Sequence, residues 1–425
     1  MKILVLASGL GTAHRGYERF VLDMAEQLRA QGCQVSCWGS ADAQEVSGLP
    51  VLGREALERL ALENLRKNPD LSSFAFPELH DWAQHTEDQL FGIAATARLR
   101  QEIRLNPPDV VYLKWQGGLI DAGGKSTGLM ELLAQEGRAG GIRTIVHTDW
   151  VYPVAIERFA SARFSFHATS PWVAQRLRAL GVRADLILEL PMAARCLPFQ
   201  DLAGRRSRMR QEAGIPEAAF AVLTVGAFDN EVKNFPYLVR ELAPLGSDED
   251  FYWIAAGSRG SEPAAWEKEA QALFGPRFVP RVGVPFERMP DVYALADLSL
   301  CGSLDETFGL CYLESHFAGL PCLMHDYRVT QWITEDLPPE LASVSRIDMR
   351  GEGNVLAAVE QWRALLTNSH RRAAASGILE DFRHAQEKRF SWEHLGPSFA
   401  NAFGKTAHPP VAEAQAASLR QGARA

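Results

Sequence analysis

The chain has 425 residues and a formal net charge of -8 at pH 7, from 44 Lys and Arg against 52 Asp and Glu. A hydrophobic fraction of 47% and a charged fraction of 23% are typical of a folded globular protein and exclude disordered and fibrous classes. At roughly 100–200 residues per domain the length fits two domains, and the acidic balance gives no bulk attraction for nucleic acid.

The first predicted elements are a buried strand over 2–7, a glycine turn and a helix. Apolar residues recur at helical spacing from Phe20 to Leu28, before Gly32 ends the helix. This order of elements is typical of the start of a parallel α/β sheet. The other elements predicted in this half are strands over Gln34–Trp38, Asp109–Leu113, Arg143–His147, Phe164–Ala168 and Asp185–Leu188, and a charged helical stretch from about 54 to 105.

A polar, basic stretch around 198–216 has no apolar periodicity and separates this half from a second one. The alternation of strands and helices restarts at Phe220. Strands are predicted over Ala221–Val225, Tyr252–Ala255, Phe278–Val282, Leu298–Cys301 and Cys322–His325, and helices near 235–242, 264–273, 286–294, 310–318, 352–368, 370–389 and 392–403.

We therefore expect an α/β chain of two doubly wound, Rossmann-like domains that face each other across a cleft, with ligands at the carboxyl ends of the strands. The expected domains are 1–200 and 201–390, followed by a final helix over 391–405 and a frayed tail over 406–425.

The apolar runs and the cysteine spacing indicate neither a targeting signal nor a metal-binding motif. No apolar run approaches the roughly 18–20 residues that span a bilayer, and the apolar stretch that ends at Ala7 is too short for a secretory signal. The six cysteines show no spacing typical of a zinc site: Cys33, Cys37, Cys196, Cys301, Cys311 and Cys322. We expect a cytoplasmic protein with free thiols, no metal site and no main role at a membrane.

The most informative stretch runs from Cys301 to Glu314, where a predicted strand ends, a polar turn follows and a helix begins. The backbone N–H groups of Gly309, Leu310 and Cys311 would be the unpaired donors of a helix N-terminus, which favour an anion. Glu306 could accept hydrogen bonds from sugar hydroxyls, and Glu314 from a ribose diol. The ordinary alternative is a glutamate-capped helix with a second glutamate on its solvated face.

The run Glu306-Thr307-Phe308-Gly309-Leu310, followed by Glu314 and by Ala318-Gly319-Leu320-Pro321, resembles the donor-site signature of retaining family 4 glycosyltransferases of the GT-B fold. The resemblance implies transfer of a sugar from a nucleotide-diphosphate sugar to an acceptor with retention at the anomeric carbon. It places Phe308 with the other donor-binding residues, and it implies that the final helix, opened by Phe390-Ser391-Trp392, crosses back to the first domain.

In the first half the matches to this family are weaker. Arg15-Gly16-Tyr17-Glu18 looks like the family's Gly-Gly-x-Glu motif, which assigns Gly16 and Glu18, with Gly11 of the preceding turn, to donor binding. Arg15 replaces the first glycine, which puts close backbone approach to a diphosphate in doubt. His147, directly after Thr144-Ile145-Val146, stands where the family has a histidine near the reacting sugar; a structural histidine is the alternative.

In the second half, Val225-Gly226-Ala227-Phe228 followed by Lys233 resembles the family's paired cation site for the donor diphosphate. Only the lysine is present, and Arg259 is a candidate to replace the missing arginine. Because a helix N-terminus disfavours a cation, a bound phosphate explains Lys233 there better than surface charge does. The segment with Val282 and Val284 is the one that the family pairs with the nucleobase.

Two phosphate-binding motifs are incomplete. Gly9-Leu10-Gly11-Thr12-Ala13-His14 lacks the third glycine of the dinucleotide fingerprint, and Gly123-Gly124-Lys125-Ser126 lacks the leading glycine of a P-loop. A nicotinamide enzyme is therefore disfavoured, and the second motif is better explained as a loop on the acceptor side.

Catalysis is expected from Lys233 and the helix-start amides at the leaving phosphate, with Glu306 and His147 at the sugar. Retaining glycosidases use two carboxylates about 5–5.5 Å apart, and no second carboxylate is evident beyond Asp149. The resemblance instead implies front-face attack, in which the departing phosphate takes the acceptor proton, without a metal or another cofactor. A UDP-sugar is favoured as co-substrate and a GDP-sugar is the alternative.

The acceptor, a saccharide or other small molecule, is expected on the first domain. Its candidate contacts are His14, Trp115, Lys125 and Asp149. Three other functions stay open: a GT-B sugar-nucleotide epimerase, a phosphorylase, and a nucleotide-sugar-binding protein with little activity.

Overall fold

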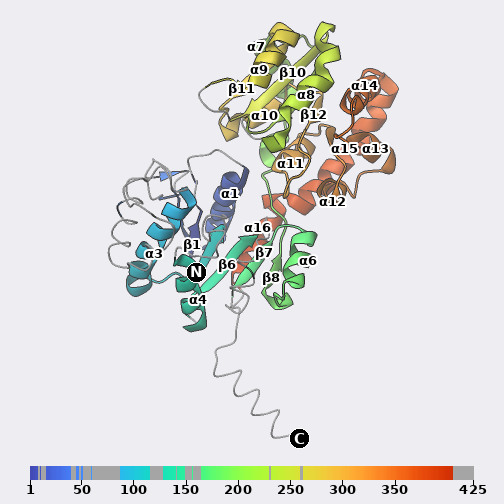
Figure 1. Cartoon of the computed structure of the whole chain (residues 1–425). Coiled ribbons are helices and arrows are strands. Elements are labelled where there is room, and N and C mark those ends of the chain that lie inside the picture. Colours follow the sequence, from blue (N-terminus) through green and yellow to red (C-terminus); the bar gives the residue numbers. More distant parts are fainter. Residues whose placement is uncertain are drawn as a thin grey trace, which may run out of the picture. The chain divides into compact units, whose positions relative to one another are not determined.

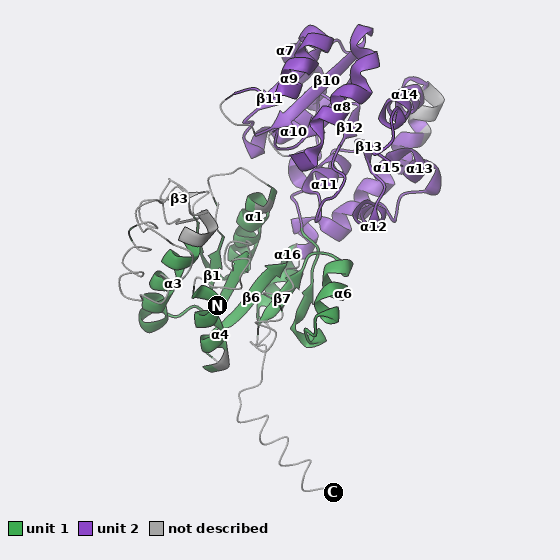
Figure 2. Ribbon diagram, viewed as in Figure 1, with its two compact units in different colours: residues 1–192, 396–425 green, residues 193–395 purple. Residues whose placement is uncertain are grey.

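A computed structural model describes residues 1–7, 10, 16–39, 45–46, 49–50, 59, 87–114, 128–139, 141–148, 156, 164–228, 231–258 and 262–404. The chain forms two compact units, one of Met1–Met192 with Gly396–Ala425 and one of Ala193–Leu395 (Figure 2). Among the described residues, none of the helices combines the length and the apolar character that crossing a bilayer requires.

Unit 1 contains a six-stranded parallel sheet in the order β2-β1-β5-β6-β7-β8 (Figure 1). Its strands are β1 (Lys2–Leu6), β2 (Gln34–Trp38), β5 (Val110–Lys114), β6 (Arg143–Thr148), β7 (Ser165–Ala168) and β8 (Ile187–Glu189), and β3 (Glu45–Val46) pairs with β4 (Leu49–Pro50) separately. Its helices are α1 (Gly16–Ala30), α3 (Glu87–Leu105), α4 (Leu129–Ala139) and α6 (Pro171–Ala179), with a 3₁₀ turn at Ala184–Leu186.

Local sequence explains these elements. The strands β5 and β7 are buried along their whole length, as expected for parallel strands covered on both faces. The helix α6 begins where Ser170 accepts a hydrogen bond from the Val173 amide at 3.4 Å and Pro171 occupies the first turn, which needs no amide donor.

Unit 2 contains a second six-stranded parallel sheet, in the order β11-β10-β9-β12-β13-β14. Its strands are β9 (Phe220–Val225), β10 (Phe251–Gly257), β11 (Phe278–Val282), β12 (Leu298–Leu300), β13 (Cys322–His325) and β14 (Arg346–Ile347). Its helices are α7 (Ala203–Ala213), α8 (Phe235–Leu242), α9 (Ala265–Phe274), α10 (Met289–Tyr293), α11 (Leu310–Phe317), α12 (Arg328–Ile333), α13 (Pro339–Ser345), α14 (Asn354–Thr367) and α15 (Ser369–Phe390). Short 3₁₀ turns lie at Leu197–Phe199, Glu231–Lys233, Ala243–Ser247, Gly275–Arg277 and Phe286–Arg288.

The last helix, α16 (Trp392–Gly404), begins in unit 2, and its residues from Gly396 onward belong to unit 1. There the Phe399 ring lies 6.0 Å from the ring of Phe20. The guanidinium of Arg143 on β6 donates to the carbonyl of Ala402 at 2.6 Å. The predicted final helix is thus present, and it ends against the first sheet.

The predicted fold class, two Rossmann-like halves with parallel sheets, is confirmed. Some elements differ from the sequence pattern. The charged stretch 54–105 is described as a helix only at Arg59 and over α3, and α12, α13 and β14 occupy a stretch for which no elements were predicted.

The helix α7 lies in the polar segment that was interpreted as a break between domains. Its Arg210 is fully buried, and the guanidinium donates to the carbonyls of Leu295 at 3.0 Å and Ala219 at 2.8 Å and to the Asp297 carboxylate at 2.6 Å. Because an arginine takes the inward position that an apolar residue usually has, hydrophobic periodicity could not reveal this helix.

Candidate functional site

The strand order of unit 2 reverses between β9 and β12, because the chain moves outward to β10 and β11 and then returns to the other side of β9. Ligands of open α/β sheets bind at such a switch point, beyond the carboxyl ends of the strands. The two loops that leave β9 and β12 here carry Lys233 and Glu306, both predicted from the sequence.

Glycines let the two loops approach each other closely. A Cβ at Gly226, directly after β9, would lie 2.9 Å from Cγ of Lys233, so the lysine side chain crosses this glycine. A Cβ at Gly302, after β12, would lie 2.8 Å from the backbone oxygen of Lys233. A side chain at either glycine would force Lys233 to shift. Lys233 is therefore held between the two strand ends.

The Lys233 ammonium donates a hydrogen bond to Oε1 of Glu306 and forms an ion pair with it. Their side chains are 19% and 14% exposed. Burial alone lowers the pKa of Lys233, but the Glu306 carboxylate, followed by Cys311 and Cys301, outweighs burial and raises it above its usual value. Lys233 is therefore a permanent cation.

Buried aromatic rings and a glycine fix the loop that follows Glu306. Phe308 is buried and packs edge-to-face on Phe390 and Trp332, with ring centroids 5.7 and 5.8 Å away. Gly309 has a φ of 82° and immediately precedes α11, and a Cβ there would lie 2.4 Å from the Tyr312 ring. The amides of Gly309, Leu310 and Cys311 thus stand at the start of a helix whose entry requires glycine.

Glu314, in the second turn of α11, is only 5% exposed. The hydroxyl of Tyr293, at the end of α10, donates to its Oε2 at 2.8 Å. Burial, with the Glu314 charge second, raises the pKa of Tyr293 well above its usual value, so the phenol keeps its proton. Sequence reasoning missed Tyr293, because nothing in the local pattern connects it to a glutamate in the next helix.

Val282 and Val284 lie at the carboxyl end of the edge strand β11. Val282 is 40% exposed, and Gly283 between them has a φ of 65° and donates its amide to the carbonyl of Gly257 at 2.9 Å. The segment therefore bends at the carboxyl ends of the strands, where the loops with Lys233 and Glu306 also begin.

In unit 1, Gly16 and the buried Glu18 lie in the first turn of α1. His147 is the last residue of the predicted strand, and β6 extends one residue further, to Thr148; His147 is fully buried. Its Nδ1 lies 2.6 Å from the Tyr112 hydroxyl and 3.3 Å from Nδ1 of His167. The predicted contact of His147 with a sugar stays a prediction.

Other predicted site residues lie outside the described part of the chain: Gly11, His14, Trp115, Lys125, Asp149 and Arg259. In the part that is described, no group of three or more His, Cys, Asp or Glu side chains is arranged to hold a metal ion.

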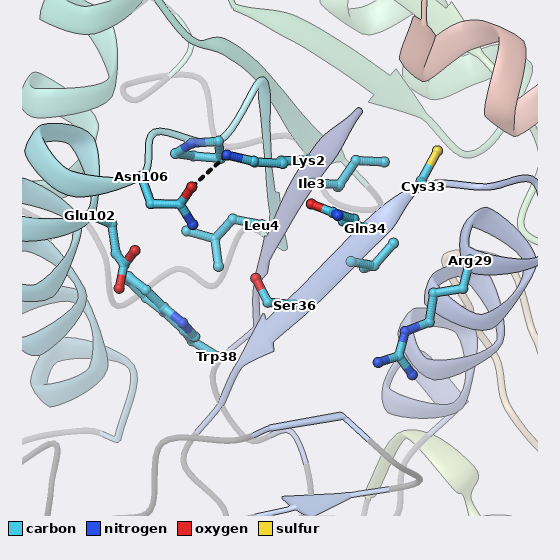
Figure 3. Close-up of a pocket in the computed structure, with 12 residues that line it drawn as sticks. Lys2, Ile3, Leu4, Arg29, Cys33, Gln34, Ser36, Trp38, Glu102 and Asn106 are labelled. Carbon is cyan, nitrogen blue, oxygen red and sulfur yellow. Dashed lines mark hydrogen bonds between the residues drawn. The ribbon is translucent and has the colours of Figure 1, made fainter.

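A pocket of about 600 Å³ lies in unit 1, over the pair β1 and β2, and Figure 3 shows its lining. Lys2 and Gln34 from the starts of the two strands line it, with Glu102 of α3 and Asn106, which directly follows α3. Lys2 and Asn106 are hydrogen-bonded to each other there. None of the predicted site residues lines this pocket, so it is separate from the switch point in unit 2.

Comparison with known proteins gives a consistent result. Residues 219–345 match the family model described as glycosyl transferases group 1, and no curated protein sequence matches the chain. The fold is similar to that of sucrose-phosphate synthase from Thermosynechococcus elongatus, with a TM-score of 0.69, 13% identity and coverage of 95% of this chain and 98% of that one.

Two further solved structures are similar over the same length. The HepE protein of Anabaena in complex with UDP and glucose has a TM-score of 0.66 and 15% identity, over 95% of this chain and 99% of its own. A glycosyltransferase from Rickettsia africae has a TM-score of 0.66 and 14% identity, over 95% of this chain and 98% of its own. At these identities the likeness establishes the GT-B fold.

Proposed function

We propose that this chain, which has the GT-B fold and whose residues 219–345 match the glycosyl transferases group 1 family, transfers a sugar from a UDP-sugar to an acceptor with retention. The resemblance predicted from the motif after Cys301 is confirmed over this segment.

The observation that carries the proposal is the ion pair of Lys233 with Glu306 at the switch point, beside the start of α11. A nucleotide-diphosphate sugar offers each of the two side chains a better partner. The diphosphate attracts the Lys233 cation, and sugar hydroxyls donate hydrogen bonds to the Glu306 carboxylate. One ligand with an anionic and a neutral polyhydroxyl part thus satisfies both residues.

The same arrangement suits the departure of a nucleoside diphosphate. Negative charge grows on the leaving phosphate in the transition state, and Lys233 with the amides of Gly309, Leu310 and Cys311 are donors fixed before the reaction begins. Because their positions are set by buried aromatic rings and glycines, little reorganisation is needed as the charge develops.

Glu314 completes the donor site as the ribose ligand. Its Oε2 accepts a hydrogen bond from the Tyr293 hydroxyl, which holds the carboxylate in place, and a carboxylate is the acceptor that a ribose diol requires. A UDP-sugar is favoured over a GDP-sugar because the similar Anabaena HepE has been solved with UDP and glucose. The bent segment Val282–Val284 is the proposed contact for the base.

The proposal is tested first by thermal unfolding with UDP-glucose, UDP-N-acetylglucosamine, GDP-mannose and ADP-glucose. A ligand at 100 times its Kd stabilises the folded protein by about 2.7 kcal/mol, so the true donor raises the unfolding temperature and the others do not. UDP release is then measured with a panel of saccharide acceptors, and NMR of the product reports the anomeric configuration.

Protection by a GDP-sugar alone would replace the donor in the proposal. Protection without UDP release, with or without acceptor, would indicate a nucleotide-sugar-binding protein. A strict requirement for free phosphate would indicate a phosphorylase, and conversion of the donor sugar to its epimer would indicate an epimerase.

A further inference from the structure

Two cysteines face each other inside the proposed donor site. Cys301 directly follows β12 and Cys311 lies in the first turn of α11, and their Sγ atoms are 3.8 Å apart. Cys301 is buried at 4% exposure, whereas Cys311 is half-buried, so the pair is closest to solvent on the Cys311 side. Both are free thiols that the proposed transfer reaction does not use.

The surroundings stabilise one thiolate in this pair. The hydrogen bond from Cys311 favours the ionised form of Cys301, and the Lys233 charge adds to it; together they lower the pKa of Cys301 to about 6 against the opposing effects of burial and of Glu306. The hydrogen bond to Cys301 raises the pKa of Cys311 well above its usual value. Because a thiolate is the nucleophilic form of cysteine, Cys301 is the more reactive member of the pair.

The other buried cysteines lack this environment. Burial raises the pKa of Cys37 to about 12, and burial together with the Glu393 charge raises that of Cys196 to about 12. Burial also raises the pKa of Cys322. Structural cysteines of this kind are inert, whereas a thiolate next to a cation and a second thiol is typical of a reactive site.

We propose that Cys301 and Cys311 form an oxidation site, which a hydroperoxide closes into a disulfide and which thereby lowers donor binding. The second half of this inference rests on the proposed function. In the first step the Cys301 thiolate attacks the terminal peroxide oxygen and the O–O bond breaks, which forms a sulfenic acid and releases an alkoxide or hydroxide that takes a proton from solvent and leaves as an alcohol or water. In the second step the Cys311 sulfur attacks Sγ of Cys301, its proton leaves with the hydroxyl as water, and the disulfide forms.

The disulfide acts on the loop that carries the donor contacts. The two sulfurs must move from 3.8 Å to about 2.05 Å, and they stand at the two ends of the loop that contains Glu306 and Gly309. Gly309 is already held by its positive φ and by the Tyr312 ring, so the loop has little freedom to absorb the shift. We expect the Glu306 carboxylate and the helix-start amides to move away from the positions that fit the donor.

The experiment uses the full chain. After treatment with hydrogen peroxide, free thiols are blocked with iodoacetamide, and peptide mass spectrometry identifies linked cysteines without any need for a ligand. We expect a Cys301–Cys311 link, an at least tenfold loss of affinity for the donor, and recovery of both with dithiothreitol. Cys311→Ser should stop at a dimedone-reactive sulfenic acid on Cys301, and Cys33→Ser, which changes another half-buried cysteine, should still form the link.

Absence of the link under conditions that oxidise other thiols would overturn the oxidation site. A link that forms without a change in donor affinity would overturn its effect on binding. If the link forms but the reduced protein binds no nucleotide sugar, the oxidation site stands and the proposed function fails.

Discussion

The ammonium of Lys233 and the carboxylate of Glu306 form an ion pair, although 73 positions separate them in the chain. The two residues meet because β9 and β12 are neighbours in the second sheet and each residue lies in the loop that leaves its strand. This pair is the centre of the proposed donor site.

Replacement of Lys233 by alanine should lower turnover by about 10²–10³, the loss that is typical of one preorganised donor at a developing charge. Steady-state kinetics with the donor found by thermal protection measure the effect. The control is Lys268→Ala, which removes an exposed lysine on α9 and should leave kcat unchanged. A Lys233→Ala enzyme with normal turnover would rule out the phosphate role.

Glu314→Ala should weaken nucleotide binding about 10- to 150-fold, because a hydrogen bond to a charged group contributes about 1.5–3 kcal/mol. Turnover at saturating donor should change less, since the ribose is remote from the bond that breaks. Calorimetric titration with UDP and GDP measures the loss, and Glu269→Ala, at an exposed site of α9, is the control. Binding equal to that of the wild type would refute the ribose role.

Tyr293→Phe separates orientation from charge in the same contact. The variant keeps the Glu314 carboxylate but removes the hydroxyl that donates to it at 2.8 Å. We expect UDP affinity to fall only about three- to tenfold, as for one ordinary hydrogen bond. A loss as large as that of Glu314→Ala would mean that Tyr293 contributes more than orientation.

Gly309→Ala should destabilise the protein more than Gly319→Ala. Both glycines have a positive φ, 82° and 68°, which costs an alanine about 1–2 kcal/mol. At Gly309 the new Cβ would also lie 2.4 Å from the Tyr312 ring, whereas nothing lies within 4 Å at Gly319. Overpacking typically adds about 1–3 kcal/mol. Urea unfolding measures the difference, and equal losses would contradict the packing at the start of α11.

Stability should fall between pH 7 and pH 5 because of His316, whose pKa burial lowers from 6.5 to about 4. As the pH falls through 6.5, the unfolded chain binds a proton that the folded chain does not. The free energy of unfolding therefore decreases. Linkage gives a loss of roughly 2 kcal/mol between pH 7 and pH 5, and the loss keeps growing until the pH falls below about 4. For His316→Asn, the free energy of unfolding measured in urea should decrease less over the same pH range, by about this amount.

The matched control for this experiment is His384→Asn, because His384 is exposed on α15. That variant should keep the pH dependence of the wild type. If His316→Asn and the wild type lose stability equally between the two pH values, His316 is not buried in its neutral form.

Much of the fold could be predicted from the sequence, because buried parallel strands are short apolar runs and the helices between them carry apolar stripes. The helix α7 was missed because a polar residue takes an inward position. Arg210 is buried in α7 because backbone carbonyls and a carboxylate satisfy its guanidinium, and that network joins segments 85 positions apart. No local sequence pattern predicts this network.

The sequence by itself determined the two α/β halves, the glycines beside the strand ends and the segment from Glu306 to Glu314 that carries the family resemblance. These are local properties, fixed by periodicity and by the few residues that a sharp turn accepts. Tertiary structure alone decided that Lys233 meets Glu306, that Tyr293 holds Glu314 and that Cys301 lies beside Cys311. The first pair depends on the order of the parallel strands, and the other two depend on how α10 and α11 pack beside β12. The amphipathic pattern of one segment carries no information about either.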